Sequence, residues 1–199
     1  MLYNQNNLNV AKFASKSDIR PVFASVLVTP TKTVATDCTR LLEVSTVANQ
    51  DASDFPDALT ALPEGTDSVL VNAKTLLAIK LPKKMSIKVL ESVAIKAIDK
   101  NTVDFVTNSL ETKQAHSIRR VDDQFPDYKQ VIPTGPPVTN IDINATLLAE
   151  LLEVMGKLNK AGSVTIECHG ANKPLVLKAV SSNGDQTALG LIMPLNNKK

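Results

Sequence analysis

Tryptophan is absent from this chain of 199 residues, and aromatic residues make up only 4% of it. Proteins that bind single-stranded nucleic acid without sequence preference use aromatic stacking platforms, so this composition argues against that class. Glycine occurs only 7 times, and the chain has no glycine-rich phosphate-binding loop. No apolar run approaches the roughly 18 residues that cross a bilayer, so we expect no membrane partner.

Cysteine is also scarce. Cys38 and Cys168 lie far apart and show no CxxC spacing, which argues against a zinc site and leads us to expect no metal. The N-terminus lacks the basic and then apolar segments of a secretory signal. We therefore expect a cytoplasmic protein with reduced thiols, although a disulfide stays open from sequence alone.

Catalytic patterns are missing as well. His116 and His169 are the only histidines, and we find no Ser-His-Asp order and no paired-carboxylate motif. His169 follows Cys168, but adjacent residues of a strand point to opposite faces, so they form a poor nucleophile–base pair. The sequence predicts neither an enzyme nor a bound cofactor.

The net charge is only +2, with 22 basic and 20 acidic residues. Nucleic-acid-binding proteins usually carry a strong basic excess or a basic face. Overall charge thus does not indicate DNA binding, but it leaves open a separation of charge onto one surface.

What the chain does contain is one pattern, a helix accompanied by several strands, that occurs three times. The first occurrence predicts a helix over 4–15 and strands over 22–29, 33–36 and 40–45. After a long loop over 46–67, with a helical turn near 57–62, the second predicts a strand over 68–71, a helix over 73–81, and strands over 87–98, 102–108 and 115–121. The third predicts a strand over 140–143, a helix over 145–159, and strands over 164–168, 175–180 and 188–193.

This repetition favours an α+β fold in which helices lie on one face of antiparallel sheets. Pro133, Gly135, Pro136 and Pro137 mark the best boundary between modules. We expect a domain of two half-domain units over 1–133 and a single half-domain over 134–199.

Three segments carry a resemblance to a known family. Residues 34–41, Val-Ala-Thr-Asp-Cys-Thr-Arg-Leu, are similar to a motif of the form T-x-x-T-D-G-x-R-L. Residues 125–133, Phe-Pro-Asp-Tyr-Lys-Gln-Val-Ile-Pro, are similar to a segment that joins two domains, and residues 191–195, Leu-Ile-Met-Pro-Leu, to a C-terminal run. In this order, the segments resemble the bacterial DNA polymerase III sliding clamp (β clamp) family.

The resemblance implies a DNA-clamp-like fold with part of the clamp missing. Residues 1–133 resemble the middle clamp domain with its opening strand short or missing, and residues 138–199 resemble the second half of the last domain. In the family, a hydrophobic cleft between these two domains binds short linear peptides of polymerases, the clamp loader and repair proteins. The residues that the resemblance assigns to this cleft are Phe23, Thr36, Cys38, Thr39, Arg40, Leu41, Pro126, Val131, Leu191, Met193, Pro194 and Leu195.

Two departures from the family pattern stand out. Cys38 takes the place of the usual glycine, so a positive φ angle there would strain the backbone. The loop over 46–67 is longer than the family leads us to expect, and could shield or reshape the cleft.

Clamps surround double-stranded DNA with helices that present basic residues, an attraction independent of sequence. The corresponding candidates here are Lys12, Lys16, Arg20, Lys74, Lys80, Lys83 and Lys84, with Lys157 and Lys160 near the third helix. Glu150 and Glu153 on that helix count against a uniformly basic lining, and a solvated face is the alternative reading.

Two functions follow from the resemblance. The chain acts as a processivity factor that recruits a DNA polymerase on DNA, or as a stand-alone peptide-binding competitor or regulator of clamp partners that does not encircle DNA. The clamp family builds its ring from six domains of two half-domain units each, so four copies of this chain, with three units each, would supply the same total. A ring-sized homo-oligomer favours the first function and a monomer the second, and a monomer or dimer that does not encircle DNA is the alternative.

Overall fold

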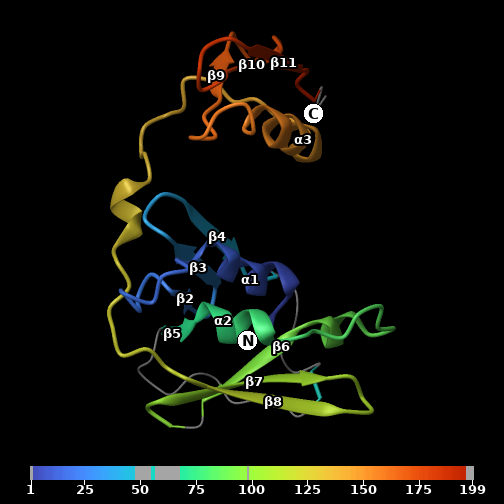
Figure 1. The fold of residues 1–199 in the computed structure, drawn as a ribbon. Helices are drawn as coiled ribbons and strands as arrows, with labels where there is room; N and C mark the ends of the chain where they lie inside the picture. The colour runs from blue at the N-terminus through green and yellow to red at the C-terminus, as the bar shows by residue number, and fades with distance from the viewer. Residues whose placement is uncertain (1, 48–54, 57–67, 98, 196–199) are drawn as a thin grey trace. The chain divides into compact units, whose positions relative to one another are not determined.

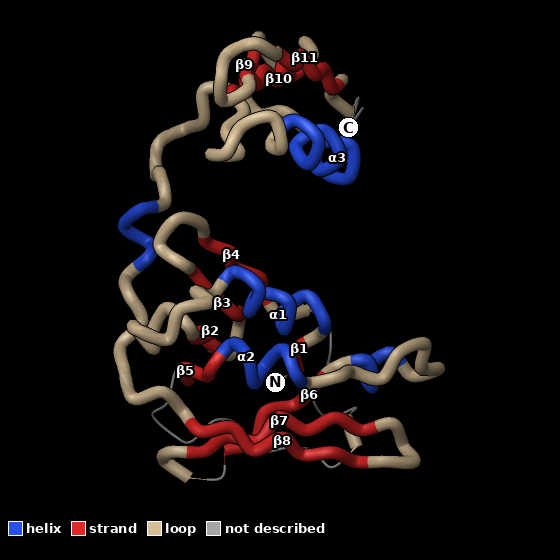
Figure 2. The backbone as a smooth tube through the Cα atoms, in the orientation of Figure 1, coloured by secondary structure: helices blue, strands red, loops and turns tan. Residues whose placement is uncertain are grey.

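The computed structural model describes residues 2–47, 55–56, 68–97 and 99–195. The chain separates into two compact units, Met1–Tyr128 and Lys129–Lys199. Figures 1 and 2 show their helices and strands. Most of the predicted 46–67 loop, including its helical turn, lies outside the described residues.

The first unit contains two antiparallel sheets. The order of one is β4-β3-β2-β5 and of the other β1-β6-β7-β8. The strands of the first sheet are β2 (Ser25–Val28), β3 (Lys32–Thr36), β4 (Leu41–Ser45) and β5 (Val69–Asn72). Those of the second are β1 (Leu2–Tyr3), β6 (Val93–Ala97), β7 (Thr102–Asn108) and β8 (Lys113–Arg119).

Two short helical segments share a core with these sheets. They are α1 (Gln5–Asn9), continued by the 3₁₀ turn η1 (Val10–Phe13), and α2 (Ala73–Ala78). Apolar residues from both helices and both sheets, among them Leu8, Leu76, Val26 and Phe105, form one buried cluster. The expected α+β architecture with antiparallel sheets is confirmed.

Each helix of this unit begins at an asparagine. The Asn4 side chain accepts hydrogen bonds from the N–H groups of Asn6 and Asn7, and the Asn72 side chain accepts one from Lys74. These bonds satisfy N–H groups that the first helical turn leaves without partners. The helix predicted over 73–81 is shorter than expected because the backbone is already extended at Ile79 (φ −70°, ψ 122°).

The strand predicted over 87–98 is wrong in its first half. A 3₁₀ turn, η3 (Lys88–Glu91), occupies it, and β6 begins only at Val93. The Glu91 carboxylate accepts hydrogen bonds from the Met85 N–H at 2.9 Å and from Lys88 Nζ at 3.1 Å. These local bonds stabilise a turn in a segment whose apolar residues are typical of a strand.

The second unit holds one helix and one sheet. Helix α3 (Ala145–Met155) packs on the antiparallel sheet β11-β10-β9, with β9 (Thr165–Cys168), β10 (Leu175–Val180) and β11 (Thr187–Ile192). Its core contains Met155, Leu175, Leu177, Ala179 and Ile192.

Two sequence predictions in this unit are wrong in detail. The helix predicted over 145–159 ends at Met155, before Gly156. Asn159, which was expected in the helix, lies after it, and its side chain forms hydrogen bonds with backbone groups of Ser163 and Val180. The segment over 140–143 forms no strand, although Leu195 donates a backbone hydrogen bond to Asp142 at 2.7 Å. In the first unit, the segments before α1 and α2 become strands by pairing with the other half of that unit.

Candidate functional site

The predicted cleft residues of the first unit gather in the turn between β3 and β4. Thr36 ends β3, and its hydroxyl donates to the Arg40 carbonyl at 2.8 Å and accepts from the Cys38 N–H at 3.1 Å. Asp37 Oδ1 accepts hydrogen bonds from the N–H groups of Thr39 and Arg40 and from the Thr39 hydroxyl. The side chains of the motif thus form a network of hydrogen bonds across the turn.

Arg40 is held in one orientation by this turn. Its Nε donates to Asp37 Oδ2 at 2.9 Å, and its guanidinium lies 4.9 Å from the centre of the Phe13 ring. Hydrogen bonds from Thr39, followed by those from Arg40, hold the pKa of Asp37 well below its usual range. The carboxylate therefore stays charged and fixes the direction of an exposed arginine.

Cys38 has a φ of +74°, the left-handed region that glycine adopts without strain. The turn consequently needs the backbone conformation for which the family motif has glycine. Both Cys38 and Cys168 are exposed and free of disulfide bonds.

Of the remaining first-unit candidates, only Leu41 adjoins this turn, as the first residue of β4. Phe23 and Leu41 are half-buried, and the Phe23 carbonyl accepts a hydrogen bond from Ser15 at 2.7 Å. Pro126 is half-buried, and its carbonyl accepts from the Tyr128 N–H at 2.8 Å, at the start of η4 (Tyr128–Val131). Val131 belongs to the second unit, where its side chain is 76% exposed.

A groove of about 710 Å³ lies between α3 and β11 in the second unit. Two predicted residues line it, Leu191 and Met193, whose side chains are 59% and 65% exposed. Residues of α3 that the sequence did not single out form the other wall, namely Leu147, Glu150, Leu151, Val154 and Met155. The groove is a mainly apolar concave surface, a form that accepts apolar anchors of a ligand.

The other two C-terminal candidates, Pro194 and Leu195, directly follow Met193 in the chain but do not line the groove. Leu195 is 48% exposed and bonds through its N–H to Asp142, and Pro194 is half-buried. The structure thus places most of the predicted cleft residues in two groups, one in and next to the β3–β4 turn of the first unit and one at and just after the end of β11 in the second. Phe23, Pro126 and Val131 belong to neither group.

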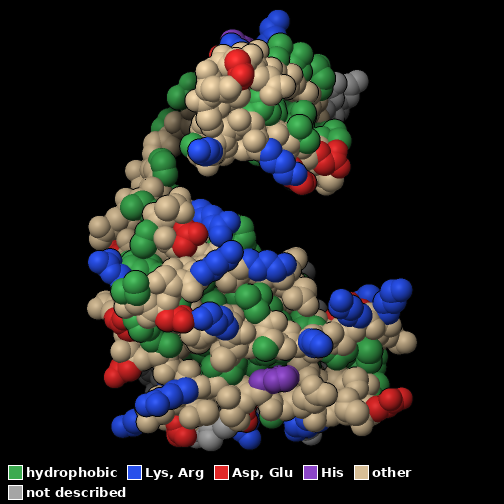
Figure 3. All heavy atoms as spheres, in the orientation of Figure 1, with side chains coloured by type: hydrophobic (Ala, Val, Ile, Leu, Met, Phe, Trp, Pro, Cys, Tyr) green, Lys and Arg blue, Asp and Glu red, His purple; other side chains and the backbone are tan. Residues whose placement is uncertain are grey.

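The basic candidates fall into two classes. Lys74 forms an ion pair with Asp18 at 2.8 Å, so its charge is compensated. The others, Lys12, Lys16, Arg20, Lys80, Lys83 and Lys84, are exposed, and no ion pair is seen for them within the described ranges. Figure 3 shows Lys and Arg side chains gathered over the part of the first unit that carries α1 and α2.

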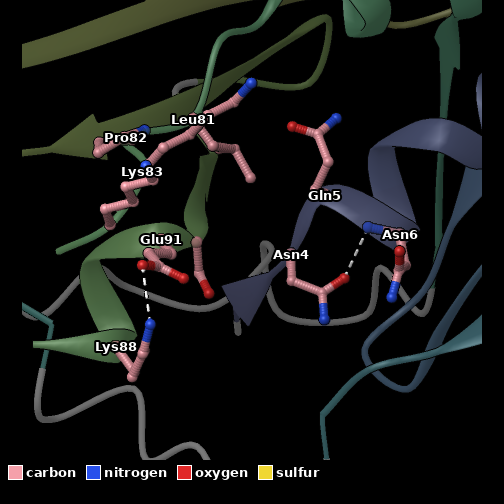
Figure 4. A pocket seen from close by; sticks show the side chains of 10 residues that line it. Asn4, Gln5, Asn6, Leu81, Pro82, Lys83, Lys88 and Glu91 are labelled. Carbon is pink, nitrogen blue, oxygen red and sulfur yellow. Dashed lines mark hydrogen bonds and ion pairs between the residues drawn. The ribbon is translucent and has the colours of Figure 1, made fainter.

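Two of these lysines line a pocket of about 330 Å³ at the start of α1. Lys83, Lys84 and Lys88 meet Asn4, Gln5 and Asn6 there, and Glu91 is its acidic residue (Figure 4). Lys88, followed by the Met85 N–H, lowers the pKa of Glu91. The pocket therefore combines a surplus of positive charge with amide groups.

Features of other protein classes are not seen in the part of the chain that the structure describes. No group of three or more His, Cys, Asp or Glu side chains there could hold a metal ion. None of the helices described has the length and apolar composition that a bilayer crossing requires. His169 lies 3.3 Å from Glu167 on an exposed surface.

No protein-family model and no curated protein matches the sequence, but solved structures match the fold. The DNA polymerase sliding clamp of Pseudomonas aeruginosa superposes with a TM-score of 0.69 at 19% identity, covering 98% of this chain and 50% of the clamp. A structure of the P. aeruginosa clamp bound to griselimycin gives 0.67 at 18% identity, with the same coverage of both chains. The DNA polymerase III β chain of Streptococcus pneumoniae gives 0.64 at 19% identity, covering 98% of this chain and 48% of that chain.

The chain therefore spans about half the length of the clamps that it matches. The match extends over both units and confirms the resemblance carried by the three short motifs. The protein has the α+β fold of the bacterial β sliding clamp, over roughly half of a clamp chain.

Proposed function

We propose that this chain is a clamp-like protein that binds linear peptide motifs of replication and repair partners. The observation that carries the proposal is the groove along β11, where Leu191 and Met193 remain exposed beside an apolar wall of α3. Exposed apolar patches bounded by polar residues mark interaction sites. These two side chains occupy the positions at which the resemblance expects peptide contacts.

The energy available from this surface suits a short peptide. Covering Leu191 and Met193 and their neighbours with a leucine or phenylalanine anchor removes apolar area from water, and full burial of one such side chain is worth about 1.5–3 kcal/mol. Ordering a flexible peptide opposes binding. A few anchors therefore support micromolar affinity, and losing one weakens binding by about tenfold or more.

The test is titration of a fluorescent peptide of the Gln-Leu-x-Leu-Phe type. The protein should bind with a micromolar Kd, and a variant with Met193→Ala and Leu191→Ala should bind at least about tenfold more weakly. Val180→Ala is the matched control, because Val180 is 51% exposed on β10 but does not line the groove. Equal affinity for all three proteins would refute the proposal.

The predicted contribution of the first unit needs its own variant. Arg40→Ala removes the guanidinium that Asp37 orients, whereas Lys12→Ala removes a nearby exposed charge that plays no part in the turn. Weaker peptide binding by Arg40→Ala alone would support the assignment of the β3–β4 turn. Unchanged binding would restrict the site to the second unit.

A second candidate function, action on duplex DNA as a processivity factor, is favoured by Lys80, Lys83 and Lys84. These lysines are exposed and close together in sequence. Duplex binding followed by fluorescence anisotropy should weaken steeply with salt, and replacing all three by glutamine should flatten that dependence. Peptide binding without any affinity for DNA would instead favour the competitor or regulator of clamp partners.

A further inference from the structure

The first unit shows how two half-units complete each other. A half-unit is defined as a segment before a helix, the helix, and the three strands that follow it; the first spans 2–47 and the second 68–121. β5 precedes α2 and pairs with β2 of the first half-unit, while β1 precedes α1 and pairs with β6 of the second. Each half-unit thus gives one segment to the other and receives one in return.

The second unit contains a third half-unit of the same construction, over 140–195. Asn144 caps the start of α3 as Asn72 caps the start of α2. The side chain of each asparagine accepts hydrogen bonding from backbone N–H groups in the first turn of its helix. Leu195 donates to the Asp142 carbonyl at 2.7 Å, and Val121 donates to the Leu70 carbonyl at 2.8 Å. Asp142 and Leu70 both lie two residues before these asparagines, so the two half-units correspond in detail.

Residues of this third half-unit are more exposed than the corresponding residues of the second. Val71, which precedes the Asn72 cap, is fully buried, and so is Leu76 on α2. The corresponding residues, Ile143 and Leu148, are only half-buried. In the described part of the second unit, this face of α3 is therefore covered less than the corresponding face of α2.

The first strand after the helix shows the same contrast. β2 and β6 each have a strand on both sides, whereas β9 pairs only with β10 in the described part of the second unit. Ile166 on β9 lies opposite Leu177 of β10, a core residue with 0% exposure, and so belongs to the face that packs on α3. Yet Ile166 is 50% exposed, since no described strand or helix of the second unit continues the core past β9.

We propose that a second copy of this chain covers that face. The segment before α3 of each copy would pair with β9 of the other, as β5 pairs with β2 and β1 with β6, under a two-fold axis. In the first unit, both segments of this kind are already paired. A second copy offers both elements that are needed, a segment before a helix and an open β9 edge.

The surface suits such a pairing. Its centre is apolar, with Ile143, Leu148 and Ile166, and the nearby Glu167 is neutralised by Lys178 at 2.7 Å. An open strand edge beside uncovered core residues readily accepts another strand. The proposal concerns a different part of the second unit from the groove along β11 and does not depend on peptide binding.

The test is the mass of the full chain in solution, measured by light scattering and sedimentation over a range of concentrations. The wild type should be a dimer, and Ile166→Lys should weaken dimerisation by at least about tenfold, because it places a charge in an apolar interface. Leu189→Lys is the matched control, because Leu189 is 68% exposed on β11, the opposite edge of the same sheet. It should remain a dimer.

Hydrogen exchange provides a second measurement that is independent of any variant. The β9 amides should become better protected as the wild-type concentration rises, while those of β11 should not change. A monomeric wild type, a dimer that survives Ile166→Lys in folded form, or a dimer without added protection at β9 would overturn the proposal.

Discussion

The Tyr128 hydroxyl donates a hydrogen bond to the Glu43 carboxylate, which joins the last residue of the first unit to β4. Lys32 strengthens this contact, since its ammonium pairs with Glu43 at 2.9 Å and lies 5.5 Å from the centre of the Tyr128 ring. Burial, followed by the bond to Glu43, raises the pKa of Tyr128. The chain thus leaves the first unit from a fixed point.

Tyr128→Phe should test this anchor. The variant keeps the ring, which packs edge-on against Phe125 at 6.1 Å, and loses only the hydroxyl. We expect the free energy of unfolding to fall by about 1 kcal/mol, the usual contribution of one hydrogen bond. Urea unfolding measures it, and in a Glu43→Ala background the same substitution should have a much smaller effect.

Cys38→Gly should stabilise the protein. Glycine adopts the φ of +74° without the steric penalty of a side chain, so we expect a gain of about 1 kcal/mol in the free energy of unfolding. Cys38→Ala separates the causes, because alanine keeps the strain and lacks the thiol. Equal unfolding midpoints for the glycine and alanine variants would show that the backbone is not strained there.

Asp37→Asn should change how stability depends on pH. Because folding lowers the pKa of Asp37, its contribution is complete above the ordinary carboxyl pKa of about 4 and is lost as pH falls through the lower folded value. The wild type should therefore exceed the variant in stability at neutral pH, and the difference should shrink in acid. Denaturant unfolding at several pH values measures this difference. Thr39→Val, which removes one donor to Asp37, should reproduce part of it, and a pH-independent difference would contradict the assignment.

Asn7→Ala should destabilise the first unit by about 1–3 kcal/mol, because it removes a buried amide and its hydrogen bonds to the neighbouring strand. Asn7 is fully buried, and its amide donates to the carbonyls of Val44 and Ser45 at 3.2 and 3.1 Å. Asn6→Ala, at an exposed position of the same helix, should change stability by less than about 0.5 kcal/mol. Thermal unfolding of the two variants makes the comparison.

Strands with alternating apolar residues between clear turns were predictable from sequence. The strands over 175–180 and 102–108 have the predicted bounds, and the one over 164–168 agrees within a residue. Prediction failed where a single side chain decides the outcome, as Glu91 does in η3. It also failed over 140–143, which pairs with no strand in the described part of the second unit.

The candidate site could be predicted from the sequence only in part. Leu191 and Met193 could be selected through a family motif, whereas the α3 wall of the groove could not, because Leu147 and Val154 look like ordinary members of an apolar helix stripe. The exposure of Leu147 and Val154 depends on how α3 packs against the sheet, which the sequence does not reveal. The buried role of Asn7 was equally hidden, since asparagine near a helix start is usually a cap.

The reciprocal pairing seen in the first unit also limits how far self-association can proceed. Each half-unit there gives one segment and receives one, so that a single partner makes both pairings. Under the proposal, the third half-unit has one face that pairs with the same face of a second copy, so that a single partner covers it completely. Association through it would end at a closed pair and would not grow into a filament.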